Sequence, residues 1–256
     1  MGQTSLALDA LPGLPEIVPG CDLAALLGEA SARARLPLVD GDVLVVAQKA
    51  VSKAEGRYLD LSRVEPSPEA PELARRVRKD PRFVEEVLRE SSAVVRATAN
   101  VLITRHRLGY VMANAGIDRS NLPAVPGAER ILLLPADPDA SARALRAGLR
   151  QATGAEVGVI VSDSFGRPWR VGTVNVALGV AGLPAVLDQR GGLDRNGRRL
   201  ETTQVALADA LAAAAGVVMG ETTESTPAVR IRGLHFDAPG GDGQGLLRPE
   251  AEDLFR

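Results

Sequence analysis

Short apolar runs separated by polar, glycine-containing loops recur along the chain, and these runs predict β-strands. Asp42–Ala47 and Val157–Val161 are almost continuously apolar, which is typical of strands buried on both faces of a sheet. Shorter apolar runs predict further strands at Val94–Thr98, Val101–Thr104, Ile131–Leu134, Val174–Leu178, Val217–Met219 and Ala228–Ile231. A short strand is also expected within Tyr110–Asn121, before a polar loop.

Helical periodicity and helix-capping residues mark the other elements. Asp22 is a candidate N-cap for a helix over 23–33, and Asp139 for a helix over 140–151 that ends at Gly154. A charged helical region over 72–91 should be interrupted at Pro81. A last, alanine-rich helix should begin at Thr202 or Thr203 and run to about residue 215.

Strands and helices are mixed along the chain and do not alternate strictly. This order favours an α+β fold with mixed sheets over a doubly wound parallel sheet. We expect one unit over residues 1–256, in which lobe boundaries would fall near 66–71 and 123–139.

Composition excludes several classes of protein. The chain has 256 residues with 30 basic and 32 acidic side chains, so it lacks the basic excess of a nucleic-acid-binding protein. Cys21 is the only cysteine, which rules out an intrachain disulfide and predicts ordinary packing. No apolar run reaches membrane-spanning length, and no signal peptide is evident at the N-terminus. We therefore expect a cytoplasmic protein.

Three acids share one sequence context, since Asp118, Asp163 and Glu221 each follow a short apolar strand in a loop of small residues. Hydroxyl side chains accompany two of them, at Ser164 and at Thr222 and Thr223. Hard divalent cations prefer such oxygen ligands, and the two histidines of the chain make a zinc site improbable. The pattern favours magnesium or manganese. The alternative is that the acids cap helices or turns.

Phosphate binding would need an unusual cradle, because the chain contains neither GxxxxGK[ST] nor GxGxxG. Lys53 could supply an ammonium, Asn121 an amide, and the run from Gly220 to Thr226 backbone N–H groups. The alternative for Lys53 is a solvated surface position. His106 stands among polar neighbours and is expected to be exposed.

Arg167 and Arg170 follow the strand that carries Asp163 and are candidate catalytic residues. Pro168 fixes one backbone angle between them, and Trp169 could anchor the turn by burying its ring. The guanidinium groups would then be held towards anionic reactants, which arginine binds with two parallel hydrogen bonds. The alternative is that both arginines are exposed and pair loosely with surface acids.

Several blocks together resemble the coenzyme F420-0:L-glutamate ligase family. They are LPEI at 14–17, DGDVLVVAQKAVSKAEGR at 40–57, ANAGIDRSN at 113–121, VSDSFGRPWR at 161–170, VMGE at 218–221 and the ending LLRPEAEDLF. Their order and spacing match over about the whole chain. Their joint occurrence is far more specific than any single block.

The resemblance implies an α+β ligase fold in two parts that forms an intertwined homodimer. It implies a GTP-dependent enzyme that adds L-glutamate to F420-0 through an acyl phosphate and releases GDP and phosphate. Magnesium or manganese, with potassium as a further cation, would support the reaction. The metal ligands would be Asp118, Asp163, Ser164 and Glu221. The GTP contacts would be Leu14, Pro15, Glu16, Ile17, Gln48, Lys53, Asn121, Met219, Gly220, Glu221, Thr222, Thr223, Glu224, Ser225 and Thr226.

This chain departs from the family pattern at Gln48, where relatives have serine, so one nucleotide contact is altered. The reductase-like domain that follows the ligase part in some bacterial relatives is expected to be absent. Two other readings stay open from the residues alone. One is a metal-dependent phosphohydrolase, which the same acids would allow, and the other is a nucleotide-binding protein without catalytic activity.

Overall fold

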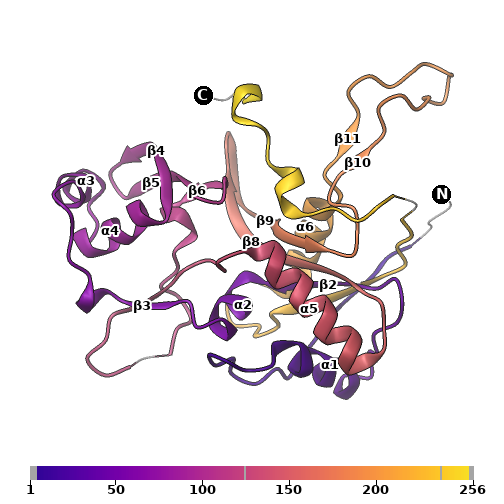
Figure 1. Cartoon of the computed structure of the whole chain (residues 1–256), viewed down its shortest axis with the longest axis horizontal. Helices are drawn as coiled ribbons and strands as arrows, with labels where there is room; N and C mark the ends of the chain where they lie inside the picture. The colour runs from indigo at the N-terminus through magenta and orange to yellow at the C-terminus, as the bar shows by residue number, and fades with distance from the viewer. Residues whose placement is uncertain (1–4, 124, 237, 254–256) are drawn as a thin grey trace.

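The computed structural model describes residues 5–123, 125–236 and 238–253 of the chain (Figure 1). Residue 124, within the expected lobe boundary at 123–139, and the last two residues of the LLRPEAEDLF block lie outside the described residues. Helices and several separate sheets are mixed along the chain, so the α+β prediction is confirmed at that level. Within the described part, no helix is both long and apolar enough to cross a membrane.

A five-stranded sheet forms the centre of the structure, in the order β1, β12, β2, β8, β9. β2 and β8 are parallel, and the other neighbouring pairs are antiparallel. The strands are β1 (Ala7–Ala10), β2 (Val43–Ala47), β8 (Gly158–Arg167), β9 (Arg170–Ala181) and β12 (Ala228–Arg232). The apolar runs at 42–47 and 157–161 are therefore central strands, as predicted.

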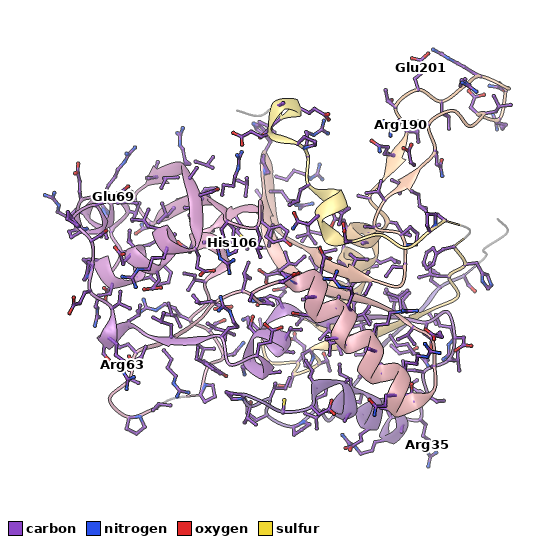
Figure 2. The ribbon with its side chains drawn as sticks, in the orientation of Figure 1. Arg35, Arg63, Glu69, His106, Arg190 and Glu201 are labelled. Carbon is purple, nitrogen blue, oxygen red and sulfur yellow. The ribbon has the colours of Figure 1, made fainter. Side chains whose placement is uncertain are left out.

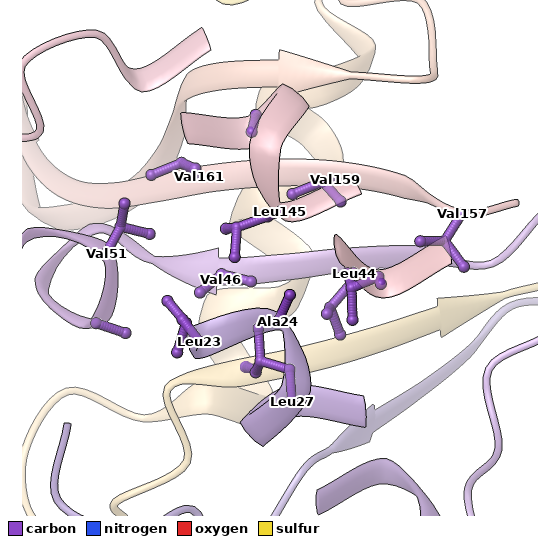
Figure 3. Packing of buried hydrophobic residues seen from close by; sticks show 14 of the residues in the cluster. Leu23, Ala24, Leu27, Leu44, Val46, Val51, Leu145, Val157, Val159 and Val161 are labelled. Carbon is purple, nitrogen blue, oxygen red and sulfur yellow. The ribbon is translucent and has the colours of Figure 1, made fainter. Parts of the chain in front are cut away.

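Both faces of this sheet are covered by helices, which explains why β2 is apolar without alternation. On one face, α1 (Leu23–Arg33), α2 (Gln48–Ala54) and α5 (Pro138–Thr153) pack on Leu44, Val46 and Val161 (Figure 3). On the other face, α6 (Leu207–Met219) packs on Val43 and Ile160. β2 and β8 thus run between two hydrophobic cores.

The segment between β3 and β7 builds a third hydrophobic core at one side of the molecule (Figure 1). Its sheets pair β3 with β7 and place β5 between β4 and β6. The elements are β3 (Tyr58–Asp60), α3 (Ala70–Val77), α4 (Pro81–Arg89), β4 (Ser91–Thr98), β5 (Val101–His106), β6 (Val111–Ala113) and β7 (Arg130–Leu132). The helical region over 72–91 is interrupted at Pro81, as expected.

A two-stranded arm, β10 (Leu187–Asp188) and β11 (Gln204–Val205), projects from the sheet, with Arg190 and Glu201 along it (Figure 2). The chain then returns through β12 and ends in two short 3-10 turns, η3 (Gly243–Leu246) and η4 (Glu250–Glu252). Arg105 of β5 forms an ion pair with Glu250, which ties this last segment to the β4–β5–β6 sheet.

Six expectations were wrong. Two concern α6, because the strand expected at Val217–Met219 is the last turn of this helix, and the helix begins at Leu207 and not at Thr202 or Thr203. Asp137, not Asp139, caps α5, and Asp139 instead accepts hydrogen bonds from the backbone N–H groups of Val180 and Gly243. His106 is fully buried, and its ring lies between the N–H of Leu108 and the carboxylate of Glu90.

The other two concern the connection from β8 to β9. β8 does not end at Ser162–Ser164 but continues into a hairpin with β9 whose turn lies at 167–170. The Trp169 side chain is 82% exposed, so it does not anchor the turn by burying its ring. A two-residue turn with Trp169 at a φ of 57° leaves the indole at the tip of the hairpin.

Candidate functional site

A cavity of about 930 Å³ lies at the carboxyl end of β2 and along the second half of β8. The two strands are parallel and Ala47 is paired with Ser162, so the segment that leaves β2 lies beside the polar residues with which β8 continues. The lining comes from residues 14–17, 47–50, 53, 112–113, 116–118, 121–123, 162–166, 175 and 219–227. All of the predicted nucleotide and metal residues lie in this cavity.

Asp118 is held in the cavity by Lys49, a residue that the sequence analysis did not select. The Lys49 ammonium lies 2.7 Å from Asp118 Oδ2 and 2.8 Å from Ser120 Oγ, and the Ser120 backbone N–H donates to Asp118 Oδ1 at 2.7 Å. Burial alone would raise the pKa of Asp118, but the hydrogen bonds from Lys49 and Ser120 outweigh it and lower that pKa below 3.8. Asp118 is therefore an ionised carboxylate with its own counter-ion.

The turn before Asp118 has an uncommon backbone. Asn114, Ala115 and Gly116 have φ angles of 52°, 52° and 69°, in the left-handed region that side chains other than glycine rarely adopt. A Cβ at Gly116 would lie 2.7 Å from Met112 Cε, so glycine is also required for packing. Backbone strain of this kind is frequent at binding sites, and here it brings Asp118 back towards β8.

Asp163 is in a different electrostatic state from Asp118. Burial raises the pKa of Asp163 to about 7, and the charges of Asp118 and Glu221 act in the same direction. The backbone N–H of Ser164 and the Lys49 ammonium oppose this rise only in part. The three acids that share a sequence context are therefore close enough to influence one another, and their negative charge is not fully compensated.

The run from Met219 to Thr226 forms a closed loop at the end of α6. Thr226 Oγ1 donates to the Met219 carbonyl at 2.8 Å, and the Glu224 carboxylate accepts the Thr222 N–H at 2.8 Å. Gly220 has a φ of 76°, which favours glycine, and a Cβ there would displace the Glu224 carboxyl group. Because Glu224 already occupies the loop's N–H groups in part, an anion bound here would compete with it.

The remaining predicted nucleotide residues come from residues 14–17, from α2 and from the loop beyond Asp118. The Lys53 ammonium forms an ion pair with Glu16 at 2.7 Å, and the Lys53 side chain is only 12% exposed. Lys53 is thus not a solvated surface lysine. Gln48 is buried, and its Oε1 accepts a hydrogen bond from Ser52. Asn121 lies on the exposed loop beyond Asp118 with a φ of 55°.

The donor set suits a hard divalent cation, because the cavity offers carboxylates with uncompensated charge and a hydroxyl, and no histidine or cysteine is among the described residues that line it. Asp118, Asp163, Ser164 and Glu221 are the residues that would hold such an ion. Within the described residues, however, no three acidic, histidine or cysteine side chains are already arranged to hold one. Binding would require the exposed Glu221 loop to approach Asp163.

Arg167 and Arg170 lie outside the cavity. Its lining ends at Gly166, and both arginines are exposed at the tip of the β8–β9 hairpin. Arg167 donates a hydrogen bond of 3.4 Å to the carbonyl of Val171. A direct contact of either arginine with a ligand in the cavity therefore stays a prediction.

The predicted metal and nucleotide contacts did not include three polar cavity residues, which are Lys49, Ser162 and Asn175. Lys49 precedes Lys53 by one helical turn of α2, and this spacing was available from the sequence. Ser162 and Asn175 stand within strands among apolar neighbours, where a polar residue that is more than nine-tenths buried is unusual. The burial of Asn175 could not be read from the sequence.

Comparisons with known proteins agree on one family. The family model described as F420-0:Gamma-glutamyl ligase matches residues 13–233. A relative from Methanopyrus kandleri, named Coenzyme F420:L-glutamate ligase, is 46% identical over 260 residues, covering 100% of this chain and 99% of the relative. Relatives of the same name from Methanothermobacter thermautotrophicus and Halobacterium salinarum are each 46% identical, over 98% and 96% of this chain and 99% and 91% of the relative.

Proposed function

The chain belongs to the F420-0:gamma-glutamyl ligase family, and we propose that it uses GTP to join L-glutamate to coenzyme F420-0. One observation in the structure supports this most strongly. A single cavity collects two lysines, five acids and a loop rich in N–H and hydroxyl groups from separate parts of the chain. Such a cavity suits a polyphosphate together with an acidic acceptor.

The proposed chemistry proceeds in two balanced steps. A carboxylate oxygen of F420-0 attacks the γ-phosphorus of GTP, the bond from that phosphorus to the β–γ bridging oxygen breaks, and GDP leaves. The amine of glutamate then attacks the acyl carbon, a C–N bond forms, and phosphate leaves with the former carboxylate oxygen. The amine gives up a proton to solvent or to a base in the cavity.

The charged and N–H groups of the cavity have different proposed roles in binding the phosphates. Lys53 would exchange Glu16 for a phosphate oxygen, and Lys49 would hold Asp118 in place while contributing positive charge near the transferred group. The N–H groups of the 219–226 loop would accept a phosphate where Glu224 now binds. These exchanges keep Lys53 and the N–H groups of the loop paired before and after the substrate enters.

We propose that Asp118, Asp163, Ser164 and Glu221 hold magnesium or manganese, and that potassium serves as a further cation. When bound, a divalent ion neutralises charge on the phosphoryl group. The ion would also offset the repulsion between the Asp163 and Glu221 carboxylates, so both could be ionised at once. The predicted role of Gln48 as a nucleotide contact is kept, through the face of its amide that Ser52 does not use.

We also propose a homodimer, working in the cytoplasm where GTP is available. Large apolar side chains at the surface support self-association, since Trp169, Val171 and Val217 are 82%, 99% and 86% exposed. Arg167 and Arg170 share the hairpin tip with two of them, so association would bury the predicted catalytic arginines. Sedimentation of wild type and of Trp169→Ala with Val171→Ser should show a dimer that the double substitution weakens.

The test of function is a reaction of F420-0, L-glutamate and GTP with Mn²⁺ or Mg²⁺, followed by mass spectrometry and GDP analysis. We expect a product one glutamyl residue heavier, formed with GTP in preference to ATP. Asp163→Asn should abolish turnover without unfolding the protein, whereas Asp22→Asn, a helix cap outside the cavity, should retain it. Phosphate release that needs neither F420-0 nor glutamate would instead favour a phosphohydrolase.

A further inference from the structure

Asn175 is a buried polar residue of the cavity that none of the predicted contacts includes. Its side chain is 7% exposed, and it lines the cavity from the middle of β9. Among the described residues, its carboxamide has no hydrogen-bond or ionic partner, and its polar atoms face the cavity. A carboxamide carries two donors and an acceptor, and burying them without partners is unfavourable unless a ligand or water completes the set.

Other uncharged polar side chains lie next to Asn175. Asn175 is paired with Ser164 across the β8–β9 ladder, and Ser162 stands two residues from Ser164 on the same face of β8. The Ser162 hydroxyl is also buried without a partner. The base of the hairpin therefore presents a row of uncharged polar groups, all with unused hydrogen-bonding capacity, beside the apolar core under α6.

Gly216 fixes the position of the Asn175 carboxamide. A Cβ on Gly216 would lie 2.7 Å from both Cγ and Oδ1 of Asn175, a distance that real contacts do not show. The carboxamide thus packs directly on the backbone of α6, in space that only glycine leaves. Gly216 interrupts an otherwise alanine-rich helix, where alanine would be the better helix former. The sequence gives up helix propensity to keep this side chain in place.

The charge around Asn175 selects the kind of ligand. The nearest acid on α6 is Asp209, whose carboxylate accepts a hydrogen bond from the Ala177 N–H two residues along β9. Its negative charge disfavours a phosphate or carboxylate at Asn175. Lys49 and Lys53 approach the cavity from α2, on the other side of the sheet from α6. An uncharged group with adjacent acceptor and donor atoms fits the carboxamide best.

We propose that Asn175, held by Gly216, binds the uncharged C=O and N–H edge of a heterocyclic substrate. This inference rests on the proposed function, whose substrates contain two such edges, one on guanine and one on the deazaflavin ring of F420-0. Glutamate contains none, because its polar groups are all charged. Asn175 is thus a specificity-determining residue for one of the two rings.

Direct binding tests this assignment without turnover. GDP is titrated by calorimetry and F420-0 by its fluorescence, with wild type, Asn175→Asp, Asn175→Ala and Gly216→Ala. Each variant should bind one of the two ligands at least tenfold more weakly, about 1.4 kcal/mol, and the other as wild type does. The weakened ligand identifies the ring. Asn100→Asp, in the exposed turn between β4 and β5, is the matched charge control and should bind both normally.

Circular dichroism melting shows whether each variant is folded, and Gly216→Ala guards against a purely structural effect. Alanine should raise the helix propensity of α6 and yet lower the affinity for the ligand, because it displaces the Asn175 carboxamide. Folded variants that bind both ligands within twofold of wild type would overturn the assignment, even if wild type is an active ligase. A wild-type protein that binds neither GDP nor F420-0 would instead overturn the proposed function on which it rests.

Discussion

Replacing Asp163 by asparagine should make the ligand-free protein more stable, and increasingly so as the pH rises. Burial raises the pKa of Asp163 to about 7, with Asp118 and Glu221 adding to the effect. The folded protein therefore keeps this proton well above the pH at which the unfolded chain loses it. Asparagine has the same shape and no proton to lose, so it removes the cost of ionising the buried group.

The magnitude follows from the two pKa values. The interval from the ordinary value of 3.8 to about 7, at about 1.4 kcal/mol per pH unit, corresponds to about 4 kcal/mol. Between these values the folded state binds more protons than the unfolded state, so wild-type stability falls as pH rises. The advantage of Asp163→Asn should grow from near zero at pH 4 to at most about 4 kcal/mol at pH 8. It is an upper limit because Asp163 borders a cavity that solvent enters.

Urea unfolding of both proteins at several pH values between 4 and 8, in the presence of a chelator, measures this difference. Asp118→Asn provides a control of opposite sign, since the Lys49 and Ser120 hydrogen bonds lower the Asp118 pKa. That variant should be less stable than wild type at neutral pH, and the loss should vanish as the pH falls below 4. A stability difference between Asp163→Asn and wild type that does not change with pH would refute the electrostatic account of the cavity.

Three further substitutions test other parts of the structure. Gly179→Ala should lower the free energy of unfolding by about 3 kcal/mol in urea, because a Cβ there would lie 2.0 Å from the Pro138 carbonyl oxygen. A variant as stable as wild type would mean that α5 does not pack so closely on β9. Glu90→Gln should lower the free energy of unfolding by about 1–3 kcal/mol at pH 7 and by little at pH 3. The His106 hydrogen bond lowers the Glu90 pKa, so the stability that the ionised carboxylate contributes is lost as the pH falls. An equal loss of stability at both pH values would contradict this. Arg170→Lys should lower kcat/KM about tenfold, roughly 1.4 kcal/mol, in steady-state kinetics. Unchanged kinetics would mean that Arg170 is a solvated surface residue with no contact to the reactants.

The parts of the fold with strong local signals could be predicted from the sequence. Asp22 caps α1 over Leu23–Arg33 as expected, because the cap residue and the apolar face both lie within one segment. Gly154 ends α5 with a φ of 77°, as a glycine at that position should. Asp139 could not be separated from Asp137 as a cap, since its real partner, the N–H of Gly243, lies 104 residues away.

The exposure of His106 and Trp169 was predicted wrongly because the residues next to them in the sequence gave no information about strand pairing. His106 stands between two arginines, yet strand alternation buries its ring while Arg105 points outward to Glu250. Trp169 is exposed because the hairpin continues past the expected strand end and carries the indole beyond the core. Both outcomes depend on where β5 and β9 pair, which the local sequence does not determine.

The acids of the site could be identified because each follows a short apolar run, although the structure places Asp163 inside β8 and Glu221 after α6, and only Asp118 comes after a strand. The sequence did not reveal which acid would be ionised. Asp118 has Lys49 beside it and Asp163 does not, and that difference arises from the left-handed turn at 114–116. Asn175 gave no signal because its role depends on Gly216, which lies on a different element.

The most direct test of the central claim is the mass of the product formed from F420-0, L-glutamate and GTP with Mn²⁺. We predict that F420-0 gains one glutamyl residue for each GDP and phosphate released, that omitting any one of the three substrates prevents the mass increase, and that GDP release requires F420-0. Release of GDP at an undiminished rate without F420-0, with no heavier product in the complete mixture, would contradict the assignment of this cavity as a ligase site.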